Sequence, residues 1–177
     1  MGVRKASCYS KMKVVPYTRK SKVKSKSYIK TVPNTNVVKL RMGDLEGFQK
    51  GKYPILIKVI SKENVQIRDI AIESVRQYVN KYLTENFGSS FYFEVKIYPH
   101  HIIRENRMLT GAGADRMSTG MSLSFGTTTG RSALVKEGSV LFLVAINEEK
   151  DEQKVRNLFN SMKSRLPCKV TIVSEKK

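Results

Sequence analysis

The chain has 177 residues, enough for one domain with a hydrophobic core and an appended tail. Its 33 Lys and Arg residues outnumber its 15 Asp and Glu residues, and the net charge of +18 indicates a polyanionic partner, either nucleic acid or an anionic membrane surface. No membrane span is expected, because the longest apolar run, residues 140–146, is far shorter than the roughly 20 residues of a transmembrane helix. No secretory signal is expected either, because no apolar segment follows the N-terminal charges.

The first 35 residues, here called the basic arm, contain ten Lys or Arg residues and no acidic residue. Few apolar residues and two prolines predict an extended tail that does not fold by itself. Tyrosines between the cations can stack on bases while the cations meet phosphates, so we favour nucleic-acid binding over a merely solvated segment or a localisation signal. The predicted RNA contacts of the arm are Arg4, Lys5, Tyr9, Lys11, Lys13, Tyr17, Arg19, Lys20, Lys22, Lys24, Lys26, Tyr28 and Lys30.

The next segments predict two strands and a helix. Residues 36–42 and 53–61 alternate between two faces, as strands do. Residues 66–87 carry apolar side chains at three- and four-residue spacing, which predicts an amphipathic helix. We expect Asn64 to cap the start of this helix and Gly88 to end it.

The second half predicts more strands and a second helix. Residues 91–98 and 101–105 read as strands, and residues 132–146 as a hairpin that turns at Glu137 and Gly138. Asn147 is expected to cap the second helix. The side chains expected to be buried on that helix are Val155, Leu158, Phe159 and Met162.

Residues 169–173 predict the last strand. Strands that follow one another without crossover helices favour antiparallel pairing. The expected fold class is α+β: a mixed, mostly antiparallel sheet covered by two amphipathic helices, in a single domain of residues 36–177. The basic arm precedes this domain, and one long glycine-rich loop interrupts it.

Residues 108–130 are predicted to form that loop, because they contain five glycines and eight serines or threonines without apolar periodicity. Loops longer than about 12–15 residues in a compact domain are usually functional or disordered. Arginines at the base and middle of the loop, with two histidines ahead of it, suit an anionic partner. The predicted RNA contacts here are His100, His101, Arg104, Arg107, Arg116 and Arg131.

The sequence contains no motif that predicts a metal-binding or catalytic site. Cys8 and Cys168 lack a CxxC pair and the only two histidines are adjacent, so no metal site is expected. The glycine-rich residues 111–115 lack the third glycine of a dinucleotide motif, so no cofactor is expected. A hydrolase that uses His101 and Asp115 is a rival interpretation, but no nucleophile motif accompanies this pair, and we expect no enzyme.

Four short motifs resemble those of one family. They are RxxxCY at residues 4–9, PYTRK at 16–20, QIRxxAxExxR at 66–76 and YPHHIIRENRMLxxAGADRMxxGM at 98–121. In these motifs, and over nearly its whole length, the chain resembles the archaeal and eukaryotic large-subunit ribosomal protein ten-e, the counterpart of bacterial large-subunit ribosomal protein sixteen.

This resemblance implies a structural, non-enzymatic constituent of the large subunit of cytoplasmic ribosomes. Its implied partners are large-subunit rRNA near the central protuberance and the peptidyl transferase region, tRNA in the assembled ribosome, and neighbouring ribosomal proteins. An RNA-binding regulatory protein outside the ribosome is the alternative. The residues that the resemblance places in a tRNA-proximal loop are Ala112, Gly113, Ala114, Asp115, Arg116, Gly120 and Met121.

The chain departs from the family pattern at residues 121–130, which read MSLSFGTTTG where the family usually reads MRxAFGKPxG. Ser122 replaces an Arg, Thr127 a Lys and Thr128 a Pro. The return limb of the loop therefore lacks two phosphate-pairing cations and one fixed φ. We expect this limb to be more mobile, or its missing charge to come from another part of the particle.

Overall fold

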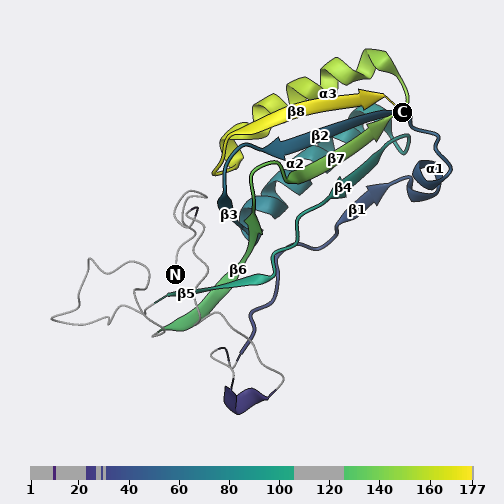
Figure 1. Ribbon diagram of the computed structural model, residues 1–177. Coiled ribbons are helices and arrows are strands. Elements are labelled where there is room, and N and C mark those ends of the chain that lie inside the picture. The colour runs from purple at the N-terminus through teal and green to yellow at the C-terminus, as the bar shows by residue number, and fades with distance from the viewer. Residues whose placement is uncertain (1–9, 11–22, 27–28, 30, 106–125, 177) are drawn as a thin grey trace.

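The computed structural model describes residues 10, 23–26, 29, 31–105 and 126–176, which form two antiparallel sheets and three α-helices (Figure 1). The predicted α+β class is confirmed. The strands lie in two sheets, however, where a single sheet was predicted. None of the helices in the described ranges is long and apolar enough to cross a bilayer.

The larger sheet has five strands, and each neighbouring pair is antiparallel. Along residues 55–61, one of its inner strands, Ile55, Ile57 and Val59 are at most 2% exposed, while the intervening side chains on the other face are only partly buried. In spatial order the strands are β1 (Arg41–Gly43), β4 (Tyr92–Val95), β7 (Val140–Ile146), β2 (Ile55–Ser61) and β8 (Val170–Lys176).

The smaller sheet has three strands, with β6 (Thr127–Val135) between β3 (Val65–Arg68) and β5 (His101–Glu105). Ser10 of the basic arm lies beside β3, because its carbonyl oxygen accepts a hydrogen bond from the Gln66 amide at 2.9 Å. In Figure 1, β5 and β6 extend away from the five-stranded sheet.

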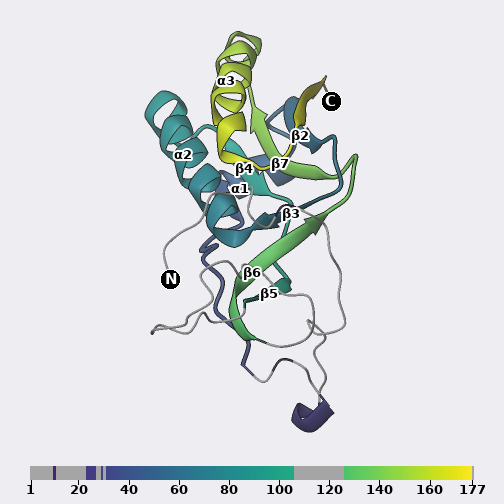
Figure 2. The same cartoon turned by 90° about the vertical axis from the view of Figure 1, so that its left-hand side faces the viewer.

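The two long helices, α2 (Asp69–Phe87) and α3 (Glu149–Met162), cover one face of the five-stranded sheet, as predicted (Figures 1 and 2). α2 ends at Gly88, whose φ of +58° favours glycine. A short helix, α1 (Leu45–Gln49), lies on the opposite face, where the ring of Phe48 stacks on Tyr92 with centroids 4.1 Å apart. The predicted buried residues of α3 are all at most 3% exposed; they are Val155, Leu158, Phe159 and Met162.

The start of the first long helix was predicted wrongly. Residues 66–68 belong to β3, and Ile67 pairs with Ala133 of β6. Arg68 is the N-cap residue of α2, while the Asn64 side chain accepts a hydrogen bond from the Glu137 amide at 3.0 Å. Pairing with a strand that is distant in sequence overrides the local helical spacing here.

The predicted hairpin at residues 132–146 is also wrong. The chain does turn at Gly138, where φ is +79°, but β6 pairs with β3 and β5, whereas β7 pairs with β2 and β4. Strand β6 begins at Thr127, so residues 127–130, which were predicted as loop, are strand. The turn thus carries the chain from one sheet into the other.

Other element ends also differ, such as those of β2, which begins at Ile55, and of β8, which extends to Lys176. The strand predicted at residues 36–42 is limited to β1, and that predicted at 91–98 is limited to β4. The N-cap residue of α3 is Glu148 and not Asn147. Two short 3₁₀ turns, η3 (Lys24–Lys26) and η4 (Lys163–Arg165), lie in the arm and directly after α3.

Candidate RNA-binding surface

The strands β5 and β6 border the predicted loop in sequence; residues 101–105 and 126–135 are here called the β5–β6 ribbon. The two strands pair from His101 opposite Ser132 to Glu105 opposite Thr127, with an irregularity after Ile103. The Arg104 guanidinium donates from Nη2 to the carbonyl oxygen of Gly126 at 2.7 Å. This bond holds the end of β5 against the residue that precedes β6.

Residues 31–38, here called the arm root, are fixed to this ribbon by two side chains of β6. Arg131 donates from Nε to the carbonyl oxygen of Pro33 at 2.7 Å. The hydroxyl of Thr128 donates to the carbonyl oxygen of Thr31 at 3.3 Å. The basic arm therefore joins the core at the ribbon.

Two carboxylates of α2 hold the C-terminal part of the arm root. The backbone N and the side-chain Nδ2 of Asn36 both donate to Asp69 Oδ2, at 3.0 and 2.7 Å, and Asp69 is only 1% exposed. Glu73 accepts from the Val38 amide at 3.5 Å. The Arg76 guanidinium, which donates to Glu73, holds the pKa of the Glu73 carboxyl below its usual value.

The turn between β4 and β5 presents an aromatic ring and two imidazoles. Tyr98 is 48% exposed, and its hydroxyl lies 3.5 Å from Nη1 of Arg131. His100 is exposed, with Nδ1 3.1 Å from the Tyr98 carbonyl oxygen. Burial, assisted by repulsion from His100, lowers the pKa of the half-buried His101. At neutral pH His101 is therefore uncharged and can contact RNA only as a hydrogen-bonding group.

The ribbon is suited to a negatively charged partner. Its exposed and half-exposed polar side chains are imidazole, guanidinium and hydroxyl groups, while Glu105, its one carboxylate within the described ribbon residues, is buried. Guanidinium and hydroxyl groups donate hydrogen bonds to phosphate oxygens. The arm root adds its backbone to the same region.

The predicted RNA contacts divide into two groups. The structure brings His100, His101, Arg104 and Arg131 together at the ribbon. Lys26 is exposed in η3, and Lys24 belongs to the same turn. The remaining predicted contacts lie outside the described residues: Arg4, Lys5, Tyr9, Lys11, Lys13, Tyr17, Arg19, Lys20, Lys22, Tyr28, Lys30, Arg107, Arg116 and the loop residues Ala112, Gly113, Ala114, Asp115, Gly120 and Met121.

Sequence reasoning missed Tyr98 and Thr128 as members of this surface. Tyr98 was predicted as the last residue of a strand, although the adjacent Pro99 marks it as the start of a turn. Thr128 was considered only as a replacement for a proline. Its hydroxyl, which proline lacks, makes the bond to Thr31.

Comparison with known proteins gives consistent results. The family model described as ribosomal protein L16p/L10e matches residues 12–173. The large ribosomal subunit protein uL16 of Pyrobaculum arsenaticum is 39% identical to this chain over 178 residues, which cover 100% of the chain and 94% of that protein. The uL16 protein of Methanococcus maripaludis is 37% identical over 180 residues, covering 99% and 97%. The chain belongs to the ribosomal protein L16p/L10e family.

Proposed function

We propose that this protein is a structural constituent of the large ribosomal subunit, and not an enzyme, and that it binds large-subunit rRNA through the basic arm and the β5–β6 ribbon. Membership of a ribosomal protein family supports the ribosomal role. The observation that carries the RNA-binding proposal is the attachment of the arm root to the ribbon by Arg131 and Thr128.

The attachment matters because it joins two cationic parts of the chain. Ten cations precede residue 36, and the arm root ties this segment to the strands on either side of residues 106–125. Phosphate contacts of this kind position a protein on RNA without reading bases. We infer that arm and ribbon bind adjacent parts of one folded rRNA region.

A finer placement follows from the family resemblance. We propose that the protein lies near the central protuberance and the peptidyl transferase region, with residues 112–121 directed toward tRNA and with other ribosomal proteins as neighbours. The support is the match of the segment AGADRMSTGM to the family pattern. The RNA-binding regulator outside the ribosome stays the alternative.

Sedimentation of cell extracts through a moderate-salt sucrose gradient tests the proposal. The protein should move with the large subunit, and crosslinks from His100 and from the arm should map to large-subunit rRNA. A protein that stays in the light fractions but still binds RNA would instead support the regulator. Crosslinks to tRNA from position 114 in translating ribosomes would support the placement of the loop.

A further inference from the structure

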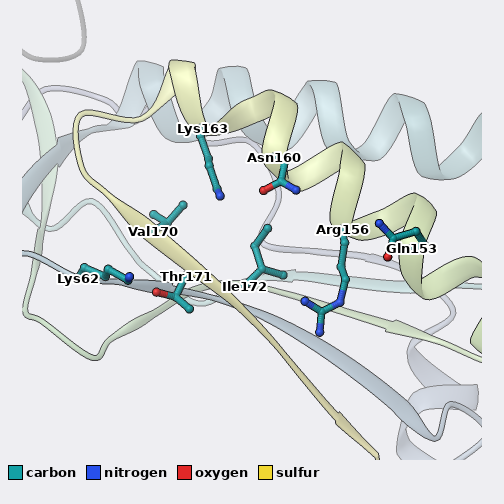
Figure 3. Close-up of a pocket in the computed structure, with 8 residues that line it drawn as sticks. All are labelled: Lys62, Gln153, Arg156, Asn160, Lys163, Val170, Thr171 and Ile172. Atoms are coloured by element: carbon teal, nitrogen blue, oxygen red, sulfur yellow. The ribbon is translucent and has the colours of Figure 1, made fainter.

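A polar groove lies between α3 and β8, away from the β5–β6 ribbon (Figures 1 and 3). Its volume is about 420 Å³. Figure 3 shows the side chains of Arg156, Asn160 and Lys163 directed from α3 toward β8. The groove is lined by Lys62, Gln153, Arg156, Asn160, Lys163, Val170, Thr171 and Ile172.

Two positive charges of this groove have no compensating carboxylate. Lys62 and Lys163 are both exposed, and neither forms an ion pair with any acidic residue in the part of the chain that the structure describes. Arg156 donates from Nε to Glu152 at 2.8 Å and from Nη2 to Ser174. The guanidinium is thereby held in place beside the two free ammonium groups.

The three acidic residues of α3 are already paired; Glu152 pairs with Arg156 of the groove, and the other two are not among the residues that line it. Glu149 pairs with Lys176 at 2.6 Å, and Asp151 pairs with Lys154 at 2.8 Å. From residue 153 to residue 169 the sequence contains five Lys or Arg residues and no Asp or Glu. The charge on this side of the molecule is therefore segregated, with the positive part at the groove.

The groove residues of α3 form a linear array. Residues 153, 156, 160 and 163 follow one another at spacings of three, four and three, which places them on one face of the helix. At 1.5 Å per residue they extend over about 15 Å. Two amide side chains, one guanidinium and one ammonium thus line a track along which an extended polyanion can lie.

The composition of the groove favours RNA over a protein partner. Lys, Arg, Asn, Gln and Thr side chains donate hydrogen bonds to phosphate oxygens. A protein interface would be expected to have an apolar centre with aromatic or Met side chains, and Val170 and Ile172 are the only apolar residues that line the groove. The remaining lining groups are positively charged or can donate a hydrogen bond.

We propose that this groove binds the phosphate backbone of a second rRNA segment, distinct from the segment at the ribbon, so that the protein bridges two parts of large-subunit rRNA. The inference rests on the proposed ribosomal function. The groove would be a second binding surface of the protein. It lies next to α3, and α1 packs on the opposite face of the five-stranded sheet.

The first test compares two double variants of the full-length protein for binding to deproteinised large-subunit rRNA. Lys62→Ala with Lys163→Ala removes the two free groove charges, and Lys50→Ala with Lys81→Ala removes two exposed charges outside the groove. A plot of log affinity against log salt has a negative slope, and we expect it to become less steep by about 1.4–1.8 in the groove variant, the value for two phosphate contacts. The control variant should keep the wild-type slope. Equal slopes for the two double variants would overturn the proposal.

The second test identifies the partner in the assembled particle. A photo-crosslinking residue is placed at position 160 in the groove or at position 100 beside the ribbon, and the large subunit is isolated before irradiation. The proposal predicts rRNA crosslinks at both positions that map to separate segments, with the position-160 crosslink lost in the Lys62→Ala, Lys163→Ala background. A position-160 crosslink to protein alone, or none, overturns the bridging role. Loss of the position-100 crosslink and of large-subunit sedimentation would instead overturn the proposed function itself.

Discussion

Arg131 donates a hydrogen bond from its guanidinium Nε to the carbonyl oxygen of Pro33 at 2.7 Å, across 98 residues of sequence. An arginine that composition alone assigns to phosphate binding therefore also positions the backbone of the basic arm. Lysine at the same position would keep the charge but lose the planar donor geometry of the guanidinium. Charge and positioning can thus be separated by one substitution.

Arg131→Lys should loosen the arm root without removing charge. We expect backbone amides of residues 34–38 to exchange about tenfold faster with deuterium, as follows from the loss of one hydrogen bond worth roughly 1–1.5 kcal/mol. The salt dependence of rRNA binding should stay as in the wild type. Arg165→Lys, in η4, is the control and should leave exchange at residues 34–38 unchanged. Unchanged exchange in Arg131→Lys would show that this bond does not hold the arm root.

Asp69→Ala should destabilise the fold, because it removes the buried carboxylate that accepts two hydrogen bonds from Asn36. The expected loss in the free energy of unfolding is about 1–3 kcal/mol, measured by urea denaturation. In a double-mutant cycle with Asn36→Ala, the second substitution should cost much less in the Asp69→Ala background. Strictly additive effects would mean that the two side chains are not coupled.

Gly43→Ala should be more harmful than Gly51→Ala, although both glycines have positive φ, at +84° and +76°. A Cβ atom at position 43 would lie 2.1 Å from the carbonyl oxygen of Phe91, whereas one at position 51 would have no neighbour within 4 Å. Each substitution costs roughly 1–2 kcal/mol for its backbone conformation. Only Gly43→Ala should also separate β1 from β4. Thermal unfolding of the two variants gives the difference, and similar melting temperatures would contradict the predicted collision.

The stability of the protein should fall as the pH decreases through the titration of His101. Burial lowers the pKa of His101 in the folded state, so the unfolded chain, with a pKa near 6.5, binds the proton more readily. The free energy of unfolding should therefore be unaffected by this group above about pH 7 and decrease from about pH 6.5 down to the folded-state pKa. His101→Gln should reduce this decrease, whereas His100→Gln should largely retain it. Urea denaturation across this pH range measures the free energy of unfolding. The same pH dependence in wild type and in His101→Gln would show that His101 does not cause the decrease.

Deletion of residues 1–22 should weaken rRNA binding and reduce its salt dependence. The deletion removes seven cations, and if all seven meet phosphates the slope of log affinity against log salt should change by about 5–6. The core should stay folded, because the main buried cluster begins at Val37. Filter-binding titrations at several salt concentrations measure the slope, and circular dichroism checks the fold. Equal slopes for the two forms would mean that this part of the arm does not bind phosphate.

Much of the fold could be predicted because local periodicity and burial agree. The alternation around Ile57 and the helical stripe around Phe159 both correspond to buried faces. The start of α2 could not be predicted. Ile67 continues the helical spacing of the residues that follow it, yet it lies in β3 and pairs with Ala133 of β6. Periodicity reports which side of an element is buried, but it does not identify the partner strand.

The candidate surface was predictable in charge but not in geometry. The sequence places Arg104 and Arg131 near one loop, yet it does not indicate that one bonds to Gly126 and the other to Pro33. These bonds depend on the register between β5 and β6 and on the path of the arm root, both of which join residues distant in sequence. The uncharged state of His101 likewise depends on its burial, which no motif encodes.

The position of β8 at the edge of the five-stranded sheet has a consequence for how the protein is made. Strand β2 pairs with β7 on one side and with β8 on the other, so the middle of the sheet is complete only when the last strand has been synthesised. While a ribosome still holds β8 in its exit tunnel, β2 lacks one of its two partners. A nascent chain of this protein can therefore complete this sheet only after residues 170–176 have left the tunnel.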